Sequence, residues 1–140
     1  VAAIREQVER SDSIVVAARS TGEREEALRA AAELARLRRT PLHVVSAYWP
    51  LLEMPAELRR RLDQTASELR ADGIEVETHL RRGSPADALL RVAEEAGARL
   101  IVIDCPPDES PRLLPGSMCA VVPHHAPCDV LVVRGPGATL

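Results

Sequence analysis

Short apolar runs alternate with longer amphipathic stretches along this sequence, and the alternation predicts a fold of mixed strands and helices. Strands are predicted where four to six apolar or alternating residues end at a turn signal, at residues 14–18, 42–47, 74–78, 100–104 and 130–133. Helices are predicted where apolar positions recur every three or four residues, at residues 24–39, 55–70, from Pro85 to near Gly97, and as a short piece at 118–122.

This order of elements predicts an α/β protein with a doubly wound parallel sheet. Parallel neighbours need crossover connections, which are right-handed and usually helical, so helices are expected on both faces of five strands. The apolar runs at 100–103 and 130–133 have the composition of strands in such a sheet. The third strand alternates apolar residues with Glu75, Glu77 and His79, which favours a half-exposed position at a sheet edge. We assign residues 13–140 to one domain and residues 1–12 to a leading helix or linker.

Two local sequence patterns predict where helices begin and end. Ser84 and Pro85 have the pattern of an N-cap followed by a first helical residue, and Asp87 stands three residues after the cap. Gly73 is suited to the left-handed residue that follows a helix.

The amino-acid composition argues against two classes of function, nucleic-acid binding and membrane insertion. Hydrophobic residues make up 46% of the chain, Phe is absent, and Tyr48 and Trp49 are the only aromatics, so Ala, Val, Leu and Ile must form the core. Few aromatics and a net charge of -3 argue against nucleic-acid binding. No stretch is apolar enough to insert into a membrane, and no signal peptide is recognisable. The three cysteines lack a pairing pattern and are predicted to be reduced thiols, which favours a cytoplasmic localisation.

Residues with reactive side chains give no catalytic or metal-binding pattern. Cys119, His124, His125 and Cys128 lack the paired spacing of zinc ligands, so no metal is expected. Acidic neighbours should keep Cys105 a weakly reactive thiol, and no nucleophile elbow occurs. The chain is therefore predicted not to be an enzyme.

Several segments together resemble the universal stress protein family. They include the first strand, the Gly83-Ser84-Pro85 helix start, the run at 100–103, the Gly116-Ser117 pair, and residues 125–128 leading into the last strand. The resemblance covers about residues 13–134. It implies the adenine nucleotide alpha hydrolase-like fold with strand order 3-2-1-4-5, dimerisation through the last strand and, in many members, ATP bound by a glycine loop after the fourth strand.

That glycine loop is altered in this chain. The family pattern places a first Gly at Asp104, a second at Pro107 and an Asp at Arg19, and only Gly116 and Ser117 match. Phosphate loops work through inward-pointing backbone N–H groups. Prolines at 106, 107, 111 and 115 lack this donor, and Asp104, Asp108 and Glu109 add negative charge. No cofactor is therefore expected.

We predict a non-catalytic regulatory or interaction module. It is expected to form a homodimer through the apolar edge made by Val130, Leu131, Val132 and Val133. An alternative is a regulator that binds ATP or AMP in an altered pose. The residues for such a site are Arg19, Asp104, Gly116, Ser117 and Met118. Because the chain begins with Val, a third alternative is a cytosolic regulatory domain from a larger transporter or sensor protein, with other domains or a protein as partner.

Overall fold

The computed structural model describes residues 12–18, 26–51, 54–105 and 118–134, which form a three-layer α/β sandwich. The strands are β1 (Ile14–Ala17), β2 (Leu42–Tyr48), β3 (Val76–Arg82), β4 (Leu100–Asp104) and β5 (Asp129–Val133). The helices are α2 (Glu26–Arg38), α3 (Pro55–Ala71), α4 (Pro85–Ala96) and α5 (Met118–His125). The predicted leading helix or linker lies mostly outside the described residues, since residues 1–11 are not among them.

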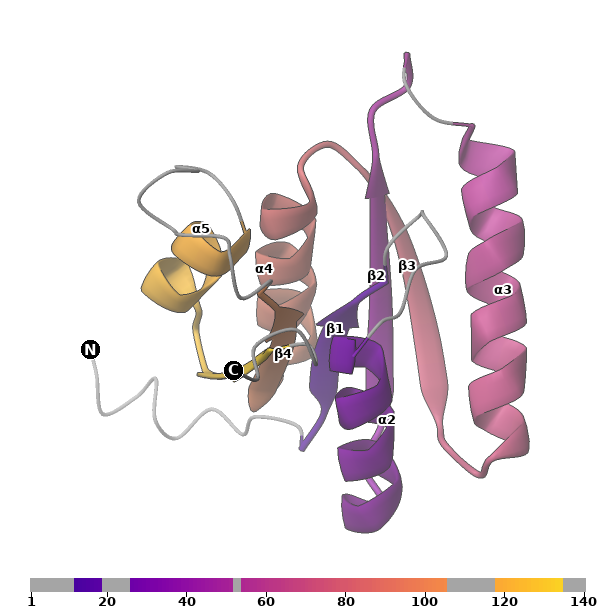
Figure 1. Ribbon diagram of the computed structural model, residues 1–140, viewed down its shortest axis with the longest axis vertical. Coiled ribbons are helices and arrows are strands. Elements are labelled where there is room, and N and C mark those ends of the chain that lie inside the picture. Colours follow the sequence, from indigo (N-terminus) through magenta and orange to yellow (C-terminus); the bar gives the residue numbers. More distant parts are fainter. Residues whose placement is uncertain (1–11, 19–25, 52–53, 106–117, 135–140) are drawn as a thin grey trace.

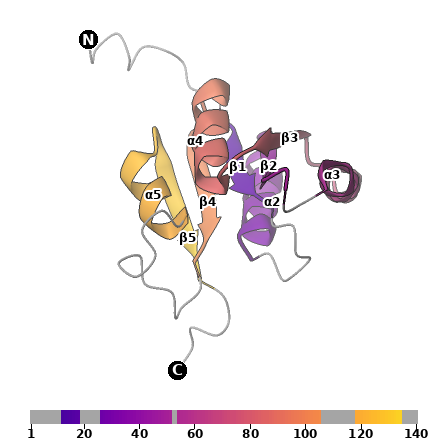
Figure 2. The same ribbon diagram turned by 90° about the horizontal axis from the view of Figure 1, so that it is seen from above.

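The five strands are parallel and lie in the order β3-β2-β1-β4-β5, which confirms the predicted topology. Helices α2 and α3 cover one face of the sheet, and α4 and α5 cover the other (Figures 1 and 2). The central strand β1 is buried on both faces. Strands β3 and β5 form the two edges, as predicted for the third and the last strand.

Ala, Val, Ile and Leu side chains form most of the core, with one cluster on each face of the sheet. Alanines at 27, 31 and 35 let α2 approach the sheet closely on one face. On the other face, Leu89 and Val92 of α4 are fully buried against the strands. Within the described residues no helix is both long and apolar enough to cross a membrane.

The helix ends follow the sequence signals with one exception. Ser84 Oγ accepts a hydrogen bond from the Asp87 backbone N–H at 3.1 Å, and Gly73 has a left-handed φ of 85°. The exception is α5, which continues to His125 although it was predicted to end at Val122. Pro123 removes one backbone donor from the last turn, and this loss does not end the helix there.

Candidate functional site

The carboxyl ends of β1 and β4 form the topological switch point of the sheet. β1 is flanked by β2 on one side and β4 on the other, so the connections after β1 and β4 lead to helices on opposite faces. Ligands of open α/β sheets bind at such a point, beyond the carboxyl ends of the strands. The segments that leave from it, residues 19–25 and 106–117, lie outside the described residues.

Asp104 is the last residue of β4 and lies at the switch point. Its carboxylate Oδ2 accepts a hydrogen bond from the backbone N–H of Ala27, in the first turn of α2, with an N···O distance of 3.3 Å. Helix N-termini carry unpaired N–H groups and a partial positive charge that attract anions. The protein therefore supplies its own anion to the end of α2 that faces the switch point.

Replacing Asp104 by Ala should destabilise the protein by about 1 kcal/mol, within the range of about 0.5–2 kcal/mol typical for loss of a helix-capping side chain. The cause is the loss of the acceptor for the Ala27 N–H. Urea unfolding followed by circular dichroism measures the change. Asp104→Asn is the matched control, because its side-chain oxygen can still accept the bond. Equal stability of Asp104→Ala and the wild type would contradict this role.

The prediction that all cysteines are reduced thiols is wrong for two of them. Cys105, just after β4, forms a disulfide with Cys119 in the first turn of α5, and their Cα atoms lie 5.9 Å apart. This separation is within the range that a disulfide spans. The apolar packing of α5 beside the end of β4 brings the two residues together, which their sequence separation of 14 does not reveal. The cysteines consequently give no support to a cytoplasmic localisation, which stays a prediction.

The other residues predicted for a nucleotide site divide into two groups. Met118 begins α5, is partly buried and packs against the apolar cluster on the α4 face. The disulfide between the adjacent Cys119 and Cys105 holds it near Asp104. Arg19, Gly116 and Ser117 lie outside the described residues. The structure thus brings Asp104 and Met118 to one end of the sheet.

The predicted dimer interface is an exposed apolar edge. β5 pairs with β4 on one side, and no described strand pairs with its other side. Val130 and Val133 pack partly against the two core clusters, whereas Leu131 and Val132 are 38% and 40% exposed. An edge strand with unpaired backbone groups and exposed apolar side chains is suited to pairing with another chain.

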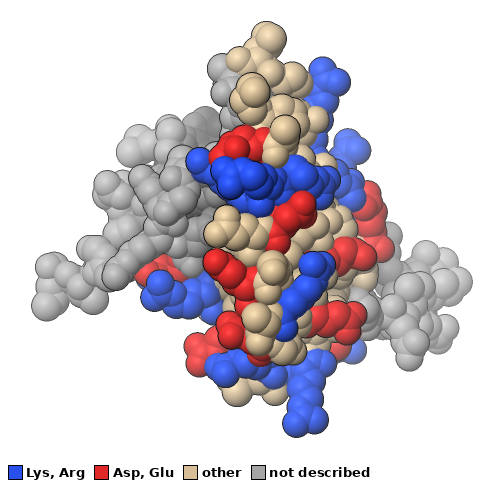
Figure 3. All heavy atoms as spheres, turned by 90° about the vertical axis from the view of Figure 1, so that its right-hand side faces the viewer, with Lys and Arg blue, Asp and Glu red and all other residues tan. Residues whose placement is uncertain are grey.

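Charged side chains of α3 pair with one another on its exposed surface. Glu57 pairs with Arg60 at 2.6 Å and with Arg61 at 3.4 Å, and the hydrogen bond from Arg60 lowers the pKa of Glu57. Figure 3 shows the side of the molecule where α3 lies, and arginines and acids are interspersed there, as expected for a solvated helix face. Trp49 and Met54, which flank the connection between β2 and α3, are 50% and 72% exposed, so neither side chain is buried against the sheet.

His43, Glu77 and His79 form a polar cluster on β2 and β3 that was not predicted from the sequence. Burial lowers the pKa of His79, and the nearby His43 ring lowers it further, while the carboxylate of Glu77 acts in the opposite direction. The alternation of Glu75, Glu77 and His79 in the sequence was the available signal. This alternation indicated that the three side chains lie on one face of β3. It could not show that His43 of β2 lies beside Glu77 on that face.

Comparison with known proteins agrees with the fold. The model of the Universal stress protein family matches residues 11–134. Universal stress protein G of Shigella flexneri is 39% identical over 79 residues, which are 56% of this chain and 55% of that protein. In this match the chain spans about half the length of the curated relative.

Solved structures of universal stress proteins are similar to this chain over most of its length. A universal stress protein in complex with cAMP is 27% identical, with a TM-score of 0.72, and the match covers 90% of this chain and 98% of that one. The universal stress protein from Archaeoglobus fulgidus in complex with dAMP is 30% identical, with a TM-score of 0.66 and coverage of 89% and 98%. These similarities confirm the predicted fold class.

Proposed function

Because this chain belongs to the universal stress protein family, we propose that it is a non-catalytic regulatory or interaction module of the stress response. In this proposal the chain acts as a homodimer joined through β5 and has no ATP site of the family type. The family and the fold are the premise. The absence of catalysis, the loss of the ATP site and the dimer are the proposed parts.

The position of Asp104 is the observation that supports the loss of the ATP site. A triphosphate at the switch point needs backbone N–H donors and a positive local potential. The carboxylate of Asp104 uses one such donor, on Ala27, and adds negative charge. A like-charge pair at ~4 Å costs on the order of 1 kcal/mol in water and several times more in a partly shielded site. A triphosphate carries several negative charges, and each one close to Asp104 would add a repulsion of this kind.

The exposed apolar edge of β5 supports the dimer. A two-fold axis at this edge would place β5 of each protomer against the same strand of its partner, which satisfies the open backbone groups of both. It would also remove Leu131 and Val132 from water, and the burial of apolar surface stabilises association by about 25 cal/mol per Å².

Isothermal titration calorimetry with ATP, ADP and AMP, each with and without Mg²⁺, tests the nucleotide part of the proposal. We expect no saturable heat up to millimolar nucleotide. The Archaeoglobus fulgidus protein titrated with dAMP is a suitable positive control, since it was solved in that complex. Saturable binding of ATP at micromolar concentration would overturn the proposed loss of the site.

A second candidate function is an adenine-nucleotide-dependent regulator. It is favoured by the two similar proteins whose structures contain cAMP and dAMP. A monophosphate needs fewer donors than ATP, and Arg19, Gly116 and Ser117 are the residues that would contact it. The same calorimetry separates the candidates, because AMP binding that Ser117→Ala weakens would support the second. Either function is compatible with a place in a larger transporter or sensor protein.

A further inference from the structure

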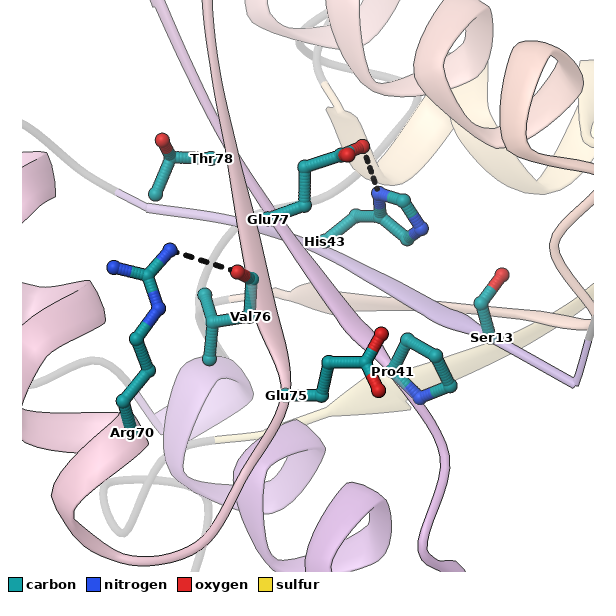
Figure 4. Close-up of a pocket in the computed structure, with 8 residues that line it drawn as sticks. All are labelled: Ser13, Pro41, His43, Arg70, Glu75, Val76, Glu77 and Thr78. Carbon is teal, nitrogen blue, oxygen red and sulfur yellow. Dashed lines mark hydrogen bonds and ion pairs between the residues drawn. The ribbon is translucent and has the colours of Figure 1, made fainter.

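Two histidines and a glutamate converge on the face of the sheet that α4 covers. His43 is on β2, and Glu77 and His79 are on β3. The parallel register pairs His43 with Glu77 and Val45 with His79, so alternate residues of both strands project to one face. Val45, two residues after His43, packs in the apolar cluster of α4 and identifies that face. Figure 4 shows Glu77 and His43 directed toward each other, with Thr78 and Arg70 on the opposite side of β3.

The three potential ligand atoms form a nearly regular triangle. His43 Nδ1 lies 2.9 Å from His79 Nε2, and Glu77 Oε2 lies 3.2 Å from each of these nitrogens. A tetrahedral Zn²⁺ with bonds of about 2.0–2.2 Å separates its ligand atoms by about 3.3–3.5 Å. A shift of a few tenths of an ångström would therefore let all three atoms bind one ion.

We propose that His43, Glu77 and His79 form a binding site for a divalent first-row transition metal of the Zn²⁺ type, with at least one coordination position open to solvent. Two imidazoles and one carboxylate are a ligand set of catalytic zinc sites and of sites for ferrous iron. Mg²⁺ and Ca²⁺ prefer oxygen ligands and do not fit this set.

The burial of the three side chains suits such a site. The imidazoles of His43 and His79 are only 12% and 15% exposed, so packing restricts their orientation before a metal binds. The side chain of Glu77 is 65% exposed and leaves the outer position accessible. A shallow pocket of about 500 Å³ has His43 and Glu77 in its wall. If both imidazoles donate a proton to Glu77 Oε2, their two N–H groups lie only 2.9 Å apart, whereas one metal ion can accept all three atoms as ligands.

The surrounding charges permit a cation. Arg81 follows His79 on the same face of β3, but its guanidinium pairs with Glu95 of α4 at 2.7 Å. The positive charge of Arg81 is thereby compensated, and Glu77 supplies a negative charge to the site. Both His43 and Glu77 are the second residues of their strands, so the site lies away from the carboxyl ends and is separate from the switch point.

Calorimetric titration of the full chain, free of any affinity tag, with Zn²⁺, Co²⁺ and Mg²⁺ tests the site. We expect one Zn²⁺ per chain, visible d–d absorption bands with Co²⁺, and no binding of Mg²⁺. His79→Ala and Glu77→Gln should each weaken Zn²⁺ binding by at least about 100-fold, because loss of a ligand should exceed the 10–100-fold that loss of a second-shell partner costs. The double variant His124→Ala/His125→Ala on α5 is the matched control and should bind like the wild type.

Loss of metal binding in these variants can be distinguished from misfolding by circular dichroism. Glu77→Gln changes a largely exposed side chain to one of the same size, so its circular dichroism spectrum should match that of the wild type. The proposal is overturned if wild-type protein binds neither Zn²⁺ nor Co²⁺. It is equally overturned if folded Glu77→Gln and His79→Ala bind both metals as the wild type does, or if the α5 double variant loses the binding.

Discussion

Lysine in place of Val132 is expected to raise the dissociation constant of the dimer by at least about 100-fold, which corresponds to about 2.7 kcal/mol. Val132 is 40% exposed on the edge strand β5, in the middle of the proposed interface. A lysine there would put an uncompensated charge on an apolar edge, and edge lysines prevent strands from pairing. The two-fold symmetry of the dimer would place this charge in the interface twice.

Leu51→Lys is the matched control for Val132→Lys. Leu51 is an apolar residue that is 97% exposed, and it follows β2, which β1 and β4 separate from β5 in the sheet. Size-exclusion chromatography with light scattering should give a dimer for the wild type and Leu51→Lys, and a monomer for Val132→Lys. A wild-type monomer at high micromolar concentration would contradict the proposed interface.

Cys119→Ser should lower the free energy of unfolding by about 3 kcal/mol, as expected for opening a closed loop of about 15 residues. The disulfide between Cys105 and Cys119 has a sequence separation of 14 and restricts the unfolded chain. Cys119 is the better position to change, because Cys105 is only 5% exposed and a serine there would bury a hydroxyl group. Urea unfolding of the oxidised proteins measures the difference.

A reducing agent provides an internal check on this effect. Reduction should destabilise the wild type by a similar amount and leave Cys119→Ser unchanged, since that variant has no Cys105–Cys119 bond to lose. Cys128→Ser keeps the disulfide and should respond to the reductant like the wild type. If reduction leaves wild-type stability unaltered, the disulfide does not contribute to it.

The parts of the fold that depend on neighbouring residues could be predicted from the sequence. The cap of α4 requires only Ser84, Pro85 and Asp87 at fixed spacings, and the structure shows the expected bond. The strand β4 could be predicted because its apolar run is visible in consecutive residues, and the structure shows that most of this run is buried. The strand order came from the family resemblance and was confirmed.

The features that depend on distant residues could not be predicted in this way. The hydrogen bond between Asp104 and Ala27 joins residues 77 positions apart, and the contact of His43 with His79 depends on the register of two strands. The disulfide likewise depends on how α5 packs beside β4. Local patterns identify which residues share a face of one element, whereas the contacts between elements require the assembled sheet.

The central claim is that the carboxylate of Asp104 occupies the position at the switch point where a bound ATP would need donors. An NMR titration of isotope-labelled protein with Mg²⁺ and ATP, which follows the backbone amides of Ala27, Asp104 and Met118, tests it most directly. The account predicts that these three resonances do not shift in a saturable way up to millimolar ATP. Saturable shifts of the same amides at micromolar ATP would contradict it.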